Sequence, residues 1–236
     1  MSREMGRSVS LAAEYTWSRT RDNLVGLRES DPADQLSPFP SGLNGVDWDQ
    51  GTSDLDIPHR AAVSLEIRSG GRNPVSLAAR GRWRSGLPFT PGFRSGVDVN
   101  GDLGGNNDPA PGDAVPNPAG TGVVATCSGT SVGGFAARNG CRESAVGSLD
   151  LRLAVPLPVG GGAGRLMLTL DAFNLVASTT GVVDRAALLI NPATALTINA
   201  ATGAVSIPYM ANPNFGTLLR RGGEPRVVRL GLRVEH

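Results

Sequence analysis

Apolar and polar residues alternate along six stretches of the chain, and this pattern predicts β-strands. In residues 8–20 one face carries only apolar or aromatic side chains, and these are Val9, Leu11, Ala13, Tyr15 and Trp17. The same alternation recurs at 60–68, 75–85, 148–157, 165–175 and 226–236. Most of these stretches have the 9–11 residues with which a tilted β-strand crosses a membrane.

The segments between these strands are of two kinds. Residues 69–74 and 158–164 are short and rich in glycine, as hairpin turns are. Residues 21–58, 86–145 and 177–224 are long and polar. Short turns at one end and long loops at the other are typical of outer-membrane β-barrels. We therefore predict one all-β domain over residues 1–236. Its fold would be an antiparallel meander of membrane-type strands with long extracellular loops, forming part of an outer-membrane barrel or a small complete one.

The stretch VSLAARGRWR (75–84) places three arginines at every second position. Arg80, Arg82 and Arg84 would share one face of the strand, and Leu77 and Trp83 the other. In a barrel wall the apolar face contacts lipid, and the arginines line the lumen. Alternation assigns further arginines to the lumen face, including Arg152 and Arg229. The alternative is a soluble antiparallel sheet whose polar face meets water.

Composition narrows the choice of function. The 236-residue chain has a net charge of +1, and all 22 basic residues are arginine. This near-neutral balance argues against a nucleic-acid-binding surface over the whole protein. The start of the chain lacks the apolar segment of a secretory signal, and no run approaches the length of a transmembrane helix.

The stretch DVNGDLGGNND (98–108) is a candidate calcium site. It offers oxygen ligands at alternating positions, and we consider Asp98, Asn100, Asp102 and Asp108. The acidic residue expected at the twelfth position of such a loop is absent, so Asx turns are the alternative interpretation. Calcium is the only cofactor that the sequence suggests.

Three other groups of residues are candidates for a disulfide, a metal site or a catalytic site. Cys127 and Cys141 share a long loop, where we expect them to form a disulfide, with free thiols as the alternative. Asp54, Asp56 and His59 form either a metal cluster or a structural motif at the entry to a strand. With His236 as the only other histidine, no catalytic triad can be assembled, and we expect no enzymatic activity.

Several local motifs together resemble one family of membrane proteins. They are YTWSRTRDN (15–23), DLDIPHR (54–60), SGLPFTPG with DVNGDLGGNNDP (98–109), LDAFNLV (170–176) and NPNFGTLLRRGGEPRVVRLGLRVEH (212–236). In this order they resemble the carboxy-terminal part of TonB-dependent outer-membrane receptors, especially the Oar-like group. The resemblance implies a Gram-negative outer-membrane protein with a barrel of about 22 strands. It also implies an internal plug and energy-driven uptake of a substrate that the sequence does not identify.

The last strand carries the insertion signal that the resemblance implies. Gly231, Leu232 and Val234 match the pattern read by the barrel-assembly machinery, and His236 stands where phenylalanine is usual. The chain departs from the family in having no plug, no TonB box and only about six clear wall strands. We therefore expect the carboxy-terminal barrel segment of a receptor, whose partners are lipid, the assembly machinery and the missing amino-terminal barrel and plug.

Two rival functions remain open at this point. One is a soluble or surface β-sandwich that binds a ligand through its long loops, and the other is a small standalone or oligomeric pore. Residues 186–210 could supply a hairpin that raises the number of strands to about eight. No partner strand is expected before residues 8–20. The chain would then form either an open curved sheet or a small barrel that pairs 8–20 with 226–236.

Overall fold

The computed structural model describes most of the chain, and all regular structure in the described residues is β. The described residues are 2–4, 8–23, 50–71, 73–94, 109–116, 118, 122–129, 131–157, 165–176, 178, 180–202, 205–206, 208–223 and 225–235. None of these residues belongs to a helix long and apolar enough to cross a membrane.

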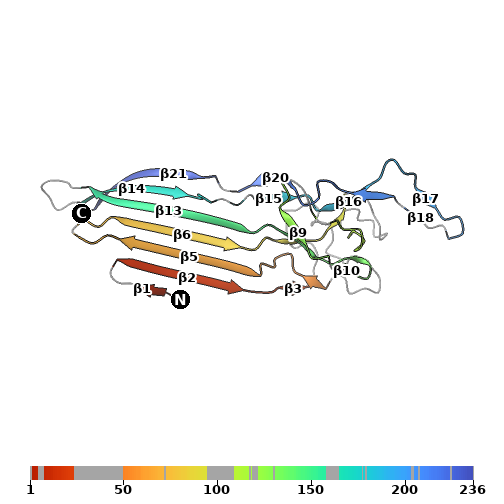
Figure 1. The fold of residues 1–236 in the computed structure, drawn as a ribbon, viewed down its shortest axis with the longest axis horizontal. Coiled ribbons are helices and arrows are strands. Elements are labelled where there is room, and N and C mark those ends of the chain that lie inside the picture. Colours follow the sequence, from red (N-terminus) through yellow and green to blue (C-terminus); the bar gives the residue numbers. More distant parts are fainter. Residues whose placement is uncertain are drawn as a thin grey trace.

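Seven strands form one long antiparallel sheet, the main sheet (Figure 1). Their order in the sheet is their order in the chain, so each strand pairs with the strands before and after it in this set. The strands are β1 (Ser2–Glu4), β2 (Val9–Trp17), β5 (His59–Arg68), β6 (Ser76–Arg84), β13 (Val146–Leu157), β14 (Arg165–Phe173) and β21 (Val227–Glu235). The last six lie within two or three residues of the stretches that alternation predicts.

The register of the main sheet aligns the apolar positions of all its long strands. Leu65 lies opposite Leu11 and Ala79, and Leu151 lies opposite Ala79 and Ala172. Because side chains alternate between faces, every other residue of each strand joins this apolar face. The residues between them form the opposite face, which we call the polar face.

One expectation about the edges of the main sheet was wrong. Residues before position 8 do supply a partner for β2, because Ser2, Arg3 and Glu4 pair with Ala12, Leu11 and Ser10. A three-residue strand is too short to show alternation, so the pattern of apolar and polar residues does not predict β1.

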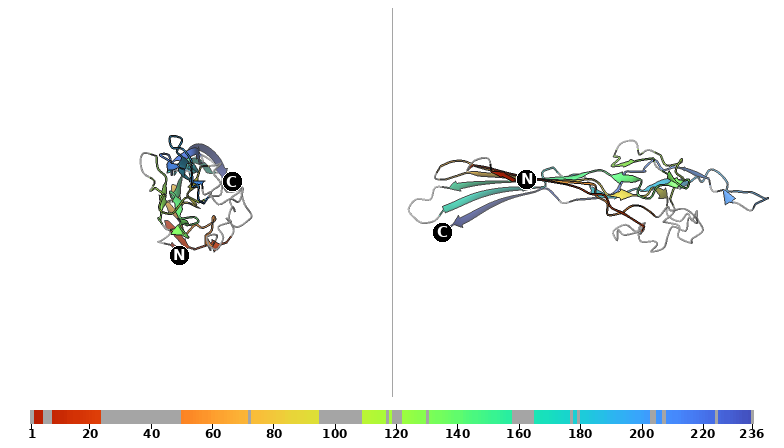
Figure 2. Two further views of the ribbon diagram at one scale, coloured as in Figure 1. Left: turned by 90° about the vertical axis from the view of Figure 1, so that its right-hand side faces the viewer. Right: turned by 90° about the horizontal axis from the view of Figure 1, so that it is seen from below.

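The main sheet is open in the described part of the chain. Strands β1 and β21 lie at its two edges and do not pair with each other. Figure 2 shows that the sheet is twisted and curved, as right-handed strand twist requires. Of the two forms expected for this chain, the structure has the open sheet.

The described parts of the long segments between the main-sheet strands form short strands at one end of the main sheet (Figure 1). We call this region the end cluster. It contains two three-stranded sheets, of order β7-β12-β9 and β19-β16-β8, and four two-stranded ones. Its strands are β3 (Arg21–Asp22), β4 (Gly51–Thr52), β7 (Pro88–Phe89), β8 (Gly92–Phe93), β9 (Ala125–Cys127), β10 (Ser131–Val132), β11 (Phe135–Ala136), β12 (Cys141–Glu143), β15 (Thr180–Val183), β16 (Ala186–Ile190), β17 (Thr197–Ile198), β18 (Val205–Ser206), β19 (Tyr209–Ala211) and β20 (Leu218–Gly222).

The hairpin expected within residues 186–210 exists, but it does not extend the main sheet. Strand β16 pairs with β19 and β17 pairs with β18. The other side of β16 pairs in parallel with β8, and its residues Ala187 and Leu188 are buried in the end cluster. The expected total of eight wall strands was therefore wrong, because burial in the end cluster holds this hairpin away from the sheet.

The hydrophobic core lies in the end cluster rather than on the main sheet. Phe89, Leu188, Val183 and Phe215 are among its buried members, and the rings of Phe89 and Phe215 meet edge to face at 6.3 Å. On the main sheet, by contrast, Leu230 keeps 74% of its surface exposed. The end cluster therefore has a packed core, whereas no described residue packs over the apolar face of the main sheet.

Candidate functional site

The polar face of the main sheet carries a ladder of charged side chains. Arg152 forms two hydrogen bonds with Asp171, with Nε–Oδ1 at 2.5 Å and Nη2–Oδ2 at 3.0 Å. Arg229 lies opposite Asp171 on the next strand, and its guanidinium lies 5.4 Å from the ring centre of Phe173. The carboxylate of Asp171 lies between two guanidinium groups and accepts charge-assisted hydrogen bonds from Arg152. Its negative charge therefore offsets positive charge in this part of the face.

The arginines expected to face a lumen all lie on this polar face. Arg80 and Arg82 alternate with apolar residues along β6, and Arg82 lies 3.6 Å from Asp150, measured from Nη2 to Oδ2. Asp150 also accepts a hydrogen bond of 2.8 Å from the backbone N–H of Asn174. The alternation therefore assigned the arginines correctly to one common face, where Asp150 on the neighbouring strand pairs with Arg82.

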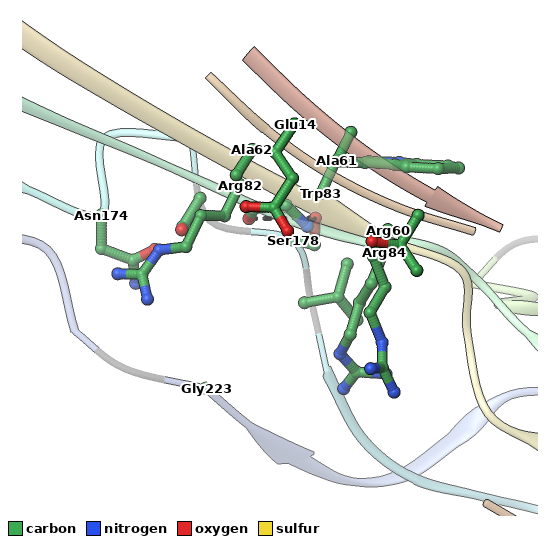
Figure 3. Close-up of a pocket in the computed structure, with 14 residues that line it drawn as sticks. Glu14, Arg60, Ala61, Ala62, Arg82, Trp83, Arg84, Asn174, Ser178 and Gly223 are labelled. Atoms are coloured by element: carbon green, nitrogen blue, oxygen red, sulfur yellow. Dashed lines mark hydrogen bonds between the residues drawn. The ribbon is translucent and has the colours of Figure 1, made fainter. Parts of the chain in front are cut away.

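A hollow of about 730 Å³ opens on the polar face where the main sheet meets the end cluster (Figure 3). Arg60 and Arg84 lie directly opposite each other on β5 and β6, and their side chains project to the same side. Arg82, Glu14 and Asn174 also line the hollow. Its lining therefore includes three arginines and the single carboxylate of Glu14.

The apolar face ends in aromatic side chains at the same end of the sheet. Tyr15 and Trp83 lie on either side of Ala61 in the register, and Trp17 lies opposite His59. Trp17 is 65% exposed, and Tyr15 donates to or accepts from His59 Nδ1 at 2.7 Å. Alternation places the two aromatic residues of β2 on the apolar face, but their grouping with Trp83 depends on the register between strands, which alternation does not predict.

Asp54 and Asp56 hold the end cluster against the main sheet. Asp54 Oδ1 accepts a hydrogen bond of 2.6 Å from Asn139 Nδ2, and Asp56 Oδ2 lies 2.8 Å from Arg142 Nη2. Asp56 Oδ1 also accepts a hydrogen bond from the backbone of Thr20 at 2.7 Å. Both carboxylates are buried and engaged by donors, which supports the interpretation as a strand-entry motif. Within the described residues, no group of acidic, histidine and cysteine side chains could hold a metal ion.

Arg138 is the buried cation at the centre of this junction. Its Nη2 lies 2.5 Å from Asp22 Oδ1 and 3.9 Å from Asp54 Oδ1, and its Nη1 donates to the backbone oxygen of Asp22 at 3.0 Å. The arginine is only 3% exposed. It therefore joins three segments that are far apart in the sequence. Sequence reasoning missed Arg138 and Arg142 because they lie in a long segment without periodicity.

A second buried junction fixes the carboxy-terminal part of the end cluster. Asp184 Oδ2 accepts hydrogen bonds from Asn212 Nδ2 at 3.0 Å and from Arg94 Nη2 at 3.3 Å. Asn212 begins the NPNFG stretch, whose Phe215 is buried in the core. Gly216 follows with φ of +77°, and a Cβ there would lie 2.7 Å from Pro118 Cβ. The NPNFG stretch therefore has a structural role in the end cluster, and its turn requires glycine at position 216.

Cys127 and Cys141 are joined by a disulfide in the structure. They lie directly opposite each other on β9 and β12, with their Cα atoms 4.0 Å apart. The bond therefore links two neighbouring strands inside the end cluster, close to the core. The candidate calcium ligands Asp98, Asn100, Asp102 and Asp108 lie outside the described residues.

The residues of the expected insertion signal lie on the edge strand β21. Leu232 and Val234 belong to the apolar face and are exposed, while Gly231 lies opposite Thr169 on the polar face. A Cβ at Gly231 would come within 2.6 Å of Thr169 Oγ1, so the glycine permits this close packing. His236 lies outside the described residues.

Comparisons with known proteins identify no relative. No family model matches the chain, and neither the curated proteins nor the solved structures contain a match.

Proposed function

We propose that the main sheet is part of the wall of an outer-membrane transport barrel, the carboxy-terminal segment of a TonB-dependent receptor. The observation that carries this proposal is the uncovered apolar face, combined with a charged polar face on the same antiparallel meander. In water such a face would expose rows of leucine and valine, which monomeric soluble proteins rarely do over a large area. In a barrel wall the same face contacts lipid, and the arginines line the aqueous lumen.

The dimensions of the apolar face support this proposal. It extends along β2, β5, β6, β13, β14 and β21, each of 9 to 12 residues. Strands of this length cross the hydrocarbon region when they are tilted. The aromatic group at one end, formed by Tyr15, Trp17 and Trp83, suits the boundary between lipid and water, where aromatic residues form a girdle.

A sheet that spans the membrane in this way also determines on which side of the membrane the end cluster lies. The end cluster adjoins the aromatic group, so in this proposal it lies outside the membrane on the extracellular side. The short connection between β5 and β6 lies at the opposite end of the main sheet (Figure 1), which is the periplasmic end in this proposal. Long extracellular segments and short periplasmic turns are the layout of outer-membrane barrels.

The open edges of the main sheet imply partner strands. In hydrocarbon each unpaired backbone group costs several kcal/mol, so a lipid-exposed edge is not tolerated. Strand β21 pairs only with β14 among the described strands. We propose that further strands of a receptor barrel pair with this edge, and that the assembly machinery recognises β21 during insertion. A plug inside the completed barrel and energy-driven uptake of a substrate belong to the same proposal.

Phase partitioning in a nonionic detergent tests this function. We expect the full chain to enter the detergent-rich phase, because its apolar face binds detergent in place of lipid. The variant Leu168→Asp/Leu232→Asp changes two opposed residues of that face and should shift the protein toward the aqueous phase. The matched variant Ile198→Asp/Leu219→Asp changes two exposed residues of the end cluster and should not.

Recovery of the unaltered chain in the aqueous phase would contradict the proposal. That outcome would favour a soluble or surface-attached binding module whose apolar face is covered by another protein.

A further inference from the structure

One row of the polar face places two positive charges directly opposite each other on neighbouring strands. Arg60 and Arg84 are direct neighbours on antiparallel strands, with Thr16 on one side and Val146 on the other. Like charges placed directly opposite each other destabilise a strand pair. In the described part of the chain, neither arginine has a carboxylate within ion-pair distance.

Other rows of the same face neutralise their arginines. Arg152 is bonded to Asp171, Arg68 lies 2.6 Å from Glu66, and Arg82 lies near Asp150. The acidic residue closest to the unusual row in register is Glu14, which lies one row away and opposite Ala62. The row that contains Arg60 and Arg84 therefore carries two positive charges and no carboxylate.

This row also lies at the hollow where a ligand has room to bind. Figure 3 shows the guanidinium groups of Arg60 and Arg84 projecting together into the space, with Arg82 and Asn174 on its other side. A guanidinium presents its donors as a planar fork that matches two oxygens of a carboxylate or phosphate. Two such forks on neighbouring strands can bind one oxyanion between them.

We infer that Arg60 and Arg84 form a binding site for an oxyanion, a phosphate or carboxylate group of a ligand. Binding of the anion would remove the repulsion between the two arginines, which gives the site its selectivity for negative charge. In the orientation proposed above, on which this step rests, the hollow lies on the lumen side next to the extracellular end cluster. The inference therefore assigns an anionic substrate to the transport function.

Titration of the full chain in detergent micelles with inorganic phosphate tests this site. Saturable binding is expected by calorimetry in the millimolar range or tighter. Arg60→Gln/Arg84→Gln should weaken binding at least tenfold. The control variant Arg68→Gln removes one positive charge, where the double variant removes two, from the polar face of β5 at roughly 26 Å along the strand from Arg60. It should change the affinity less than twofold, because Arg68 is already paired with Glu66.

Parallel titration with succinate separates the two oxyanions, and the tighter of the two identifies the group that the ligand carries. The inference is overturned if neither anion binds saturably, or if Arg68→Gln weakens binding as much as the double variant does. The result is also independent of the partitioning experiment. If the protein stays in the aqueous phase but still binds the anion through these arginines, the oxyanion site is supported and only the proposed membrane function is contradicted.

Discussion

Replacement of Arg138 by alanine is expected to destabilise the end cluster by about 3–5 kcal/mol, the cost of breaking a buried ion pair by removing one partner. The arginine is almost fully buried, and the substitution would leave the carboxylates of Asp22 and Asp54 without this cation in a region largely shielded from water. Pulse proteolysis at increasing urea concentration measures the loss of stability on the full chain in detergent.

The matched control for this prediction is Arg68→Ala. Arg68 pairs with Glu66, but its side chain is 61% exposed. Exposed ion pairs contribute about 0–1 kcal/mol, so this variant should unfold at nearly the same urea concentration as the unaltered chain. Equal urea midpoints for the two variants would show that Arg138 is not a structural centre of the end cluster.

Arginine at Leu151 is expected to destabilise the membrane-inserted sheet by about 2–4 kcal/mol, the cost of this charge on the lipid side near the bilayer midplane. Leu151 lies in the middle of the apolar face, opposite Ala79 and Ala172. Urea-induced unfolding in lipid vesicles, followed by tryptophan fluorescence, gives the change in the free energy of unfolding.

A polar-face arginine at similar depth provides the control for this measurement. Ala12 lies opposite Ser64 on the polar face. It follows Leu11, which shares the row of Leu151, so the two positions lie at similar depth. Ala12→Arg should therefore be tolerated, with a loss well below that of the Leu151 variant. The sidedness would be wrong if the Ala12 variant lost as much stability as the Leu151 variant.

Alternation allowed the long strands of the main sheet and their two faces to be predicted, because each strand repeats the same period of two. Leu65 and Arg82 were assigned to opposite faces from their positions alone, and the register of the main sheet places them so. The pairing of consecutive strands follows from the short turn between β5 and β6. Local pattern and chain connectivity therefore carried most of the information about the main sheet.

The end cluster could not be predicted in this way, because its contacts join residues far apart in the sequence. Arg138 meets Asp22 across 116 positions, and Asn212 meets Asp184 across 28. Neither contact leaves a periodic signal. Asp54 and Asp56 were noticed as a group, but their partners Asn139 and Arg142 were not. The neighbouring arginines of the oxyanion site likewise became visible only through the register between β5 and β6.

In the proposed barrel the apolar face contacts lipid and the polar face contacts water. Spin labels at positions 151 and 152, introduced one at a time into the chain in lipid vesicles, test it most directly. The two side chains are adjacent in β13 but lie on opposite faces of the sheet. The proposal predicts that the label at 151 collides with oxygen dissolved in lipid, and that the label at 152 collides with a water-soluble nickel complex. A label at 151 that is accessible to the nickel complex while the label at 152 is not would contradict it.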